Sequence, residues 1–287
     1  MKRNALLANW KTELDRLYVR YNRREFISPD PLELLYRHSE RRDREIAGLL
    51  AALLAYGGVR QIVNSATDAL ARMENRPGVF LEKSTFKDLQ KAYQGFRHRW
   101  TTGRDIAVLL AGVKAAIDRF GSLESSFLAG FLPGHETVLP ALAAWVQMLR
   151  GSGGNAHRDL LSCPRQGSAC KRLNLFLRWM VRKDDVDPGL WSRVPASKLV
   201  VPLDLHMHRI GLSWELTKRK SADLKAAIEM TEAFRAISPD DPVRYDFALT
   251  RASMRGEIEV SSPRSKAQRR TGDAARIRRA SSAGFGP

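Results

Sequence analysis

The sequence predicts an all-α fold, on three observations. Apolar residues recur at helical spacing along most of the 287 residues, which is the pattern of amphipathic helices. Alternation of apolar and polar residues, which marks a half-buried strand, nowhere lasts more than a few residues. The chain also shows no heptad array and no internal repeat, so neither a coiled coil nor a helical solenoid is expected.

Proline, glycine and capping residues divide the first half of the chain into helices. Leu14 and Leu17 fall on one face of an initial helix, and Pro31 can open the next one. The apolar run at 46–56, which Asp43 can cap and two glycines end, is hydrophobic all round. This run therefore predicts a central buried helix. Further helices are expected at 61–73, 86–96, 105–120, 123–128 and 138–149.

The second half opens with a glycine-rich loop at 151–154 and a turn-rich connection at 160–169. A helix is expected to follow from about Cys170 to Arg182, because apolar residues resume helical spacing there. Prolines at 188 and 195 mark two turns. The last helices are expected at 205–214, 221–237 and 242–254.

The chain is strongly basic, with 48 Lys and Arg against 31 Asp and Glu, a net charge of +17. Residues 261–287 hold seven basic residues and one acid, hence +6 of this charge, and have a single aromatic residue. Such a segment cannot bury enough apolar surface to fold, so we expect a disordered basic tail after one helical domain at 1–260. The domain keeps +11 (17 − 6), which favours a polyanionic partner, since its cations release counterions from phosphates.

Cysteine usage and hydropathy exclude several classes of protein. The two cysteines, Cys163 and Cys170, are too few for a four-cysteine zinc or iron–sulfur site. No secretory signal indicates a disulfide, and the longest apolar run is shorter than the ~20 residues that a membrane span needs. We therefore expect a cytoplasmic protein with reduced thiols and without a cofactor, a metal or a membrane contact. No protein partner is predicted.

Lys171 is the first candidate for chemistry. It falls in the first turn of the helix expected from Cys170, directly after a turn. A helix N-terminus carries the positive end of the dipole and free N–H groups, so it disfavours an ammonium and can hold a phosphate. An uncharged lysine amine can attack carbon. By position alone, an ordinary solvated lysine is the simpler interpretation.

Asp204 is the second candidate. Pro202 favours an extended entry, after which Asp204 falls at the N-cap of a helix whose core face carries Met207 and Ile210. A capping carboxylate accepts backbone N–H bonds and stays ionised, and in a cleft it can stabilise a positively charged sugar. By position alone, a plain helix cap is the simpler interpretation.

His206 and His208 suggest a metal site, which we regard as the least favoured alternative. Two residues apart on a helix, their rings point about 200° apart and do not converge. Asp204 and His208 share a face, but the sequence offers no third ligand cluster, whereas a catalytic site usually needs three protein ligands. A metal-dependent hydrolase would need these histidines to converge.

Three stretches resemble the helix-hairpin-helix DNA glycosylase superfamily, which includes endonuclease III and the archaeal 8-oxoguanine glycosylases. Val201-Pro-Leu-Asp-Leu-His-Met-His-Arg-Ile210 is similar to the family's Val-Asp-Thr-His-hydrophobic-x-Arg signature, whose catalytic aspartate matches Asp204. Lys171 fits the catalytic lysine that opens the second helix of the hairpin motif. Residues 43–66 are similar to two early helices whose connecting loop wedges into the hole left by a flipped base, a position that Tyr56 takes here.

The resemblance implies a fold and a set of site residues. It implies two helical subdomains around a cleft, and double-stranded DNA with a damaged or flipped base as the partner. The usual Leu-Pro-Gly-Val-Gly hairpin is reduced here to Pro164 and Gly167. The catalytic residues implied are Lys171 and Asp204, and the DNA-binding residues are Tyr56, Gly167, Ser168, Arg172, Arg178, His206 and Arg209.

Residues 11–255 also resemble an uncharacterised bacterial family, known only as a domain of unknown function, through the stretches 167–182, 186–191 and 240–249. The sequence thus favours a base-excision DNA glycosylase with possible lyase activity. The alternative is a helix-hairpin-helix module that binds DNA or RNA without breaking a bond. The enzyme needs Lys171 and Asp204 for turnover, whereas the binding module does not.

Overall fold

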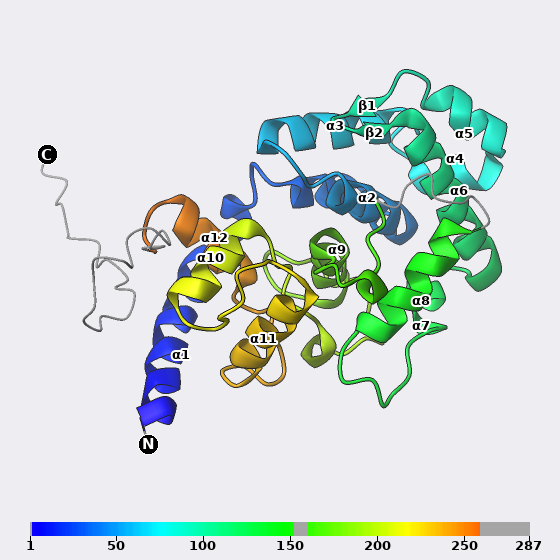
Figure 1. Ribbon diagram of the computed structural model, residues 1–287. Helices are drawn as coiled ribbons and strands as arrows, with labels where there is room; N and C mark the ends of the chain where they lie inside the picture. The colour runs from blue at the N-terminus through cyan, green and yellow to red at the C-terminus, as the bar shows by residue number, and fades with distance from the viewer. Residues whose placement is uncertain (1, 152–159, 259–287) are drawn as a thin grey trace, which may run out of the picture.

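The computed structural model describes residues 2–151 and 160–258, and their side chains from Trp10 onward (Figure 1). Helices make up nearly all of the regular structure in these residues, so the predicted all-α fold is confirmed. The helices are α1 Lys2–Tyr21, α2 Arg41–Leu53, α3 Val59–Ala71, α4 Pro77–Lys83, α5 Phe86–Ala92, α6 Gly103–Phe120, α7 Leu123–Leu128, α8 Leu139–Arg150, α9 Lys171–Val181, α10 Leu205–Ser213, α11 Leu224–Arg235 and α12 Asp246–Met254. Short 3₁₀ helices are η1 Arg24–Phe26, η2 Pro31–Arg37, η3 Pro164–Gln166 and η4 Ala196–Lys198.

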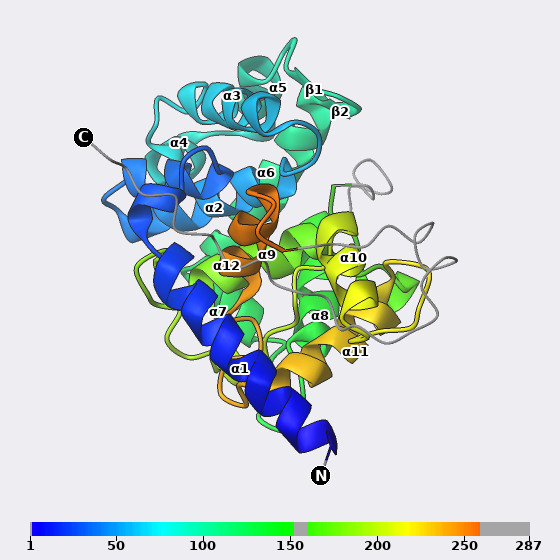
Figure 2. The same ribbon diagram turned by 90° about the vertical axis from the view of Figure 1, so that its left-hand side faces the viewer.

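The helices form two groups on either side of α9, which lies near the centre in both ribbon views (Figures 1 and 2). One group is continuous in sequence and runs from η2 to α8, with α2 packed against both η2 and α9. The other group brings α1 against α12, which also contacts α10. The chain therefore leaves the second group after α1, builds the first group, and returns.

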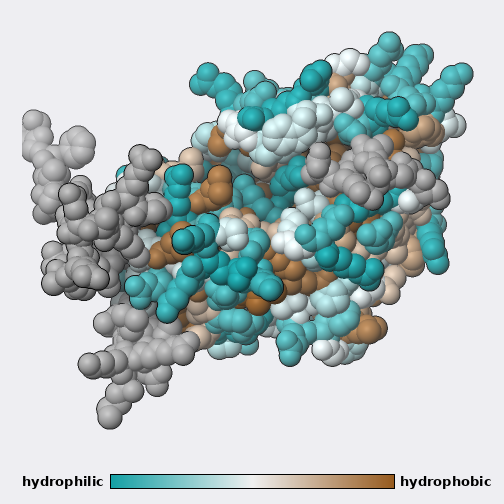
Figure 3. Space-filling view, in the orientation of Figure 1, coloured by the Kyte–Doolittle hydropathy of each residue, from teal (hydrophilic) through white to brown (hydrophobic). Residues whose placement is uncertain are grey.

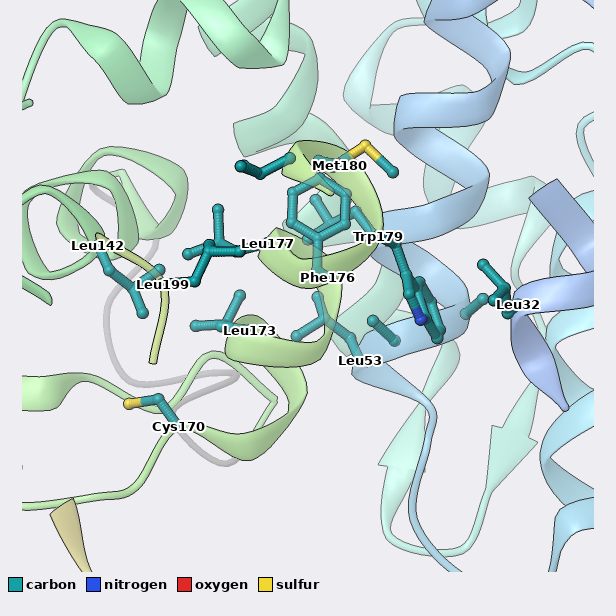
Figure 4. Close-up of a cluster of buried hydrophobic side chains, with 14 of the residues drawn as sticks. Leu32, Leu53, Leu142, Cys170, Leu173, Phe176, Leu177, Trp179, Met180 and Leu199 are labelled. Carbon is teal, nitrogen blue, oxygen red and sulfur yellow. The ribbon is translucent and has the colours of Figure 1, made fainter. Parts of the chain in front are cut away.

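The core around α9 explains why this helix is fixed in place. Phe176, Leu177 and Met180 of α9 are fully buried and pack among apolar side chains that include Leu53 of α2 and Leu142 of α8 (Figure 4). Burying such a side chain stabilises the fold by about 1.5–3 kcal/mol. The N-terminal end of α9 is consequently held against α2.

The buried helix expected over 46–56 is α2, but Asp43 is not its cap. The helix begins at Arg41 after Glu40, and Asp43 is buried in its first turn. There the Asp43 carboxylate accepts the backbone N–H of Gly78 at 2.7 Å, at the start of α4. A Cβ atom at Gly78 would lie 2.9 Å from this carboxylate, so a side chain there would make Asp43 shift. The sequence analysis missed α4 altogether.

A small β-hairpin is the other element that the sequence analysis missed. Strand β1, Arg97–His98, pairs antiparallel with β2, Thr101–Thr102, in the register Arg97–Thr102 and His98–Thr101. Arg99 in the connecting turn has φ 53°, in the left-handed region. Strands of two residues are too short to show alternation, so the pattern search could not detect them.

Hydrophilic side chains cover most of the face seen in Figure 3. Among the described helices, none is long and apolar enough to cross a membrane. The disordered tail expected at 261–287 lies outside the described residues, as do positions 152–154 of the expected glycine-rich loop.

Candidate active site

A cleft of about 750 Å³ lies where the loop after α2 meets the N-terminal ends of α9, α10 and α11. Its lining comes from four separate parts of the chain: 55–57, 162 with 166–172, 203–206 and 222–223. Aspartate side chains cap α10 and α11, whereas no side chain caps α9, so the N-terminal end of α9 is the one that favours a negatively charged ligand.

The cleft brings Lys171 and Asp204 together. Lys171 is the first residue of α9 and Asp204 directly precedes α10, and the Nζ atom of the lysine lies 3.4 Å from Oδ2 of the aspartate. Their side chains are 34% and 33% exposed, so both are reachable from solvent. An amine and a carboxylate are thus adjacent in a cavity large enough for a nucleotide. Their catalytic role stays a prediction.

Asp204 is the N-cap of α10, as the sequence predicted. Its Oδ1 atom accepts the backbone N–H of Met207 at 2.7 Å, while Oδ2 faces Lys171. Pro202 and Leu203 are buried just before it and anchor the segment that carries the carboxylate. The cap fixes one oxygen, which leaves the other aimed at the lysine.

The turn directly before Lys171 contains Gly167 and Ser168. The 3₁₀ helix η3 ends at Gly167, whose φ of 76° lies in the left-handed region that glycine adopts without strain. The Gly167 carbonyl accepts the N–H of Leu224 at 3.0 Å, and the Ser168 hydroxyl accepts the N–H of Cys170 at 3.2 Å. Gly167 and Ser168 both line the cleft, but the Gly167 carbonyl and the Ser168 hydroxyl already accept hydrogen bonds from backbone N–H groups of the protein.

Both cysteines are buried free thiols. Burial raises the pKa of Cys170 to about 12, so this thiol stays protonated at neutral pH although it lines the cleft. A protonated thiol is a poor nucleophile. Cys170 is therefore a poor candidate for a nucleophile in the cleft.

Tyr56 lines the cleft as part of a fixed aromatic cluster. Its hydroxyl donates to the carbonyl of His98 at 2.9 Å and lies 2.6 Å from the Thr101 hydroxyl. Its ring stacks on Trp100, with centroids 4.5 Å apart and planes 20° apart, and the Arg172 guanidinium lies 5.1 Å from the ring centre. If Tyr56 fills the hole left by a flipped base, the residues that contact its ring and hydroxyl would therefore take part as well.

The sequence analysis did not single out Trp100, which is the exposed member of this cluster. A usable signal was present, because an aromatic residue beside Arg97 and Arg99 is the basic and aromatic interleaving found in nucleic-acid-binding segments.

The other predicted DNA-binding residues have different surroundings. The Arg172 guanidinium donates to the Leu53 carbonyl at 2.9 Å and is half-buried. His206 lines the cleft, and its Nε2 atom has no hydrogen-bond partner among the described residues. Arg209 is exposed on α10, outside the set of residues that line the cleft.

The prediction that Arg178 contacts DNA is wrong. Its side chain is only 4% exposed. The guanidinium donates to Oδ1 of Asp187 at 3.1 and 3.2 Å and to Oδ2 of Asp246 at 2.5 Å. Arg178 is therefore a buried structural cation that neutralises two carboxylates, and no phosphate can reach it.

The two histidines considered for a metal site do not meet. His208 is 5% exposed, and its Nε2 atom lies 2.8 Å from the carbonyl of Arg219, whereas His206 lines the cleft. In the part of the chain that the structure describes, no three His, Cys, Asp or Glu residues are grouped to hold a metal ion. The arrangement thus offers no support for a metal-dependent hydrolase.

Comparison with known protein families gives one match. The family described as "Protein of unknown function (DUF2400)" matches residues 30–255, most of the chain. The chain belongs to the DUF2400 family. The match to DUF2400 begins just before η2 and ends just after α12, so it includes Lys171, Asp204 and the whole cleft and leaves out α1. Searches of curated proteins and of solved structures found no match.

Proposed function

We propose that this protein is a DNA glycosylase of base-excision repair with associated lyase activity, which uses Lys171 as the nucleophile. The observation that carries the proposal is the 3.4 Å approach of Lys171 Nζ to Asp204 Oδ2 in the cleft. The two residues are 33 positions apart, and each stands in a stretch that resembles the corresponding glycosylase motif. We place the activity in the cytoplasm, where the two free cysteines stay reduced.

The proposed chemistry begins with a nucleotide rotated out of the duplex into the cleft. The uncharged Lys171 amine attacks the sugar C1′ atom, a carbon–nitrogen bond forms, and the bond from C1′ to the base breaks. The base leaves with the bonding electrons and takes up a proton. The Asp204 carboxylate stabilises the positive charge that develops on the sugar, and it assists the proton transfers.

The lyase step follows from the same bond. Opening of the sugar ring converts the adduct into a Schiff base between Lys171 and C1′. Loss of a proton from C2′ then expels the 3′ phosphate, which breaks the strand by β-elimination. Water finally releases the lysine.

The electrostatics of the cleft suit this substrate. The N-terminal end of α9, which no side chain caps, lies at the cleft, and Arg172 and Arg209 lie on α9 and α10. Positive helix ends and arginines neutralise backbone phosphates without reading the sequence. We therefore expect the damaged base to be recognised inside the cleft and the duplex to be held at its rim.

Borohydride trapping tests the proposal. Incubation with borohydride and a panel of lesion-containing and abasic duplexes is expected to reduce the Schiff base to a stable protein–DNA adduct. Lys171→Ala is expected to give no adduct. Lys225→Ala is the matched control, because Lys225 is an exposed lysine in the first turn of α11 but does not line the cleft.

The outcome also decides between the enzyme and a non-catalytic binding module. If no duplex yields an adduct while the protein still binds DNA in a salt-sensitive way, the catalytic proposal fails and the binding module remains. If Lys171→Ala forms as much protein–DNA adduct as the wild type, Lys171 is not the nucleophile.

A further inference from the structure

The β1–β2 hairpin presents an exposed aromatic ring beside the cleft. Trp100 is 54% exposed, which is unusual for the largest apolar side chain. It stacks on Tyr56, and Tyr56 is itself a lining residue of the cleft. The two rings therefore form a short stack that leads from the cleft out to the hairpin.

Hydrogen bonds of the residues around the stack fix its position. His98 is fully buried, with Nδ1 2.9 Å from the Ser65 hydroxyl and Nε2 3.1 Å from the Tyr56 carbonyl. Thr102 at the end of β2 forms a capping box with Asp105, which fixes the hairpin to α6. Because the surroundings of the indole are already ordered, a ligand that stacks on it loses little free energy in ordering the protein.

The surroundings of Trp100 are basic. The Arg99 guanidinium lies 5.0 Å from the indole centre. Arg97 in β1 is exposed, and its Nε atom donates to the Arg99 carbonyl at 3.0 Å. The acid nearest in sequence, Asp105, accepts the backbone N–H and hydroxyl of Thr102. This charge favours a polyanion over a second copy of the chain, which would bring like charges together.

We propose that Trp100 is a stacking platform for an unpaired nucleobase of a single-stranded nucleic acid, with Arg97 and Arg99 beside the flanking phosphates. A flat ring with adjacent guanidinium groups is the combination that binds single strands with little sequence preference. This binding needs no lesion and breaks no bond, so it goes beyond the glycosylase activity and does not depend on it.

Fluorescence anisotropy with a labelled oligo-dT and an oligo-U of about 15 nucleotides, and a blunt duplex of equal length, tests the proposal. The variants are Trp100→Ala, Trp100→Phe and Phe86→Ala. Phe86, 46% exposed on α5, is the matched control for losing an exposed aromatic ring. Circular dichroism checks that each variant is folded.

Trp100→Ala is expected to weaken single-strand binding roughly 5- to 100-fold, as base–aromatic stacking predicts, while Trp100→Phe and Phe86→Ala bind as the wild type does. The two oligonucleotides show whether DNA, RNA or both provide the base. Equal binding by Trp100→Ala and wild type overturns the proposal, as does an equal loss in Phe86→Ala or an equal loss on the duplex. Because single-strand binding forms no covalent bond, its outcome is independent of a failure of borohydride trapping.

Discussion

Asp204 divides two tasks between its two carboxylate oxygens. Oδ1 caps α10 by accepting the N–H of Met207, and Oδ2 faces Lys171. Asparagine can keep the first task because it is as good an N-cap as aspartate, but it cannot supply the negative charge for the second. Structural and chemical roles of this residue can therefore be separated by substitution.

Asp204→Asn is expected to lower single-turnover cleavage by about 100-fold or more, the size of effect seen when one group that stabilises developing charge is removed. Its free energy of unfolding should stay within about 0.5 kcal/mol of wild type, whereas Asp204→Ala should lose roughly 1 kcal/mol with the cap. Quenched-flow cleavage and urea unfolding measure the two effects.

Asp223 provides the control, since it caps α11 in the same cleft through the N–H of Ala226 and pairs with Arg219. Asp223→Asn should retain most of the cleavage activity. Equal losses from both substitutions would mean that the net charge of the cleft matters and that Asp204 has no specific role.

At the scale of single residues, the sequence predicted the residues that belong to a local motif. It did not show which charged side chains are buried. Asp204 was recognisable as a cap from its own neighbours. Arg178 looked like a phosphate contact because arginine is usually exposed, yet it lies between Leu177 and Trp179 in the part of α9 at 175–181 that is otherwise apolar. An arginine inside such a helix requires buried carboxylates, and Asp187 and Asp246 supply them from distant positions.

At the scale of elements, the connection from η3 to α9 sets the position of Lys171. Gly167 adopts φ 76°, and its carbonyl binds the first residue of α11. No atom lies within 4 Å of the place where a Cβ atom would stand at Gly167. A side chain at Gly167 would consequently lower the free energy of unfolding through backbone strain and not through a clash.

Gly167→Ala is expected to lower the free energy of unfolding by about 1 kcal/mol, because an L-residue is strained in the left-handed region. It should also slow cleavage, since relaxation of the turn moves the start of α9. Gly58→Ala is the matched control, as Gly58 has φ −75° and equally open space. Differential scanning calorimetry and cleavage rates measure the two effects. Equal stability and equal cleavage rates of Gly167→Ala and Gly58→Ala would contradict this account.

The elements that the sequence missed are short. Helix α4 has seven residues and each strand of the hairpin has two, so both are shorter than the stretches over which helical or strand periodicity can be recognised. Their positions depend on long-range contacts, such as the bond from Gly78 to Asp43 and the stack of Trp100 on Tyr56. Long periodic helices were predictable because their own residues define the buried face.

At the scale of the whole molecule, Asp184 connects the end of α9 with α1. It accepts bonds from Arg182 at 2.7 Å and from the Tyr18 hydroxyl at 3.0 Å. Burial alone would raise its pKa, but Arg182 and the backbone N–H groups of Asp187 and Val186 outweigh burial. The pKa of Asp184 therefore lies below its ordinary value of 3.8.

A lowered pKa means that the unfolded chain binds the proton first as the pH falls, so Asp184 stabilises the fold above its ordinary pKa and loses this effect in more acidic solution. Asp184→Asn is expected to lower the free energy of unfolding by roughly 1.5 kcal/mol at neutral pH, since it weakens a charge-assisted hydrogen bond while Arg182 keeps Asp187 and Asp241 as partners. The difference from wild type should shrink below about pH 4.

Urea unfolding across this pH range measures the effect, with Asp185→Asn, an exposed neighbour, as the control. A difference between Asp184→Asn and wild type that stayed constant down to the lowest pH would contradict this assignment.

The packing of α1 against α12 has a consequence for the order in which the chain is made. The apolar face of α1, which includes Leu14, Leu17 and Tyr21, is covered only in the finished fold, where Tyr21 also bonds to Glu257 at 2.5 Å. A ribosome releases α1 first and its partner helix more than two hundred residues later. Throughout that interval the face remains open, so α1 is the segment of a nascent chain that a chaperone would be expected to bind.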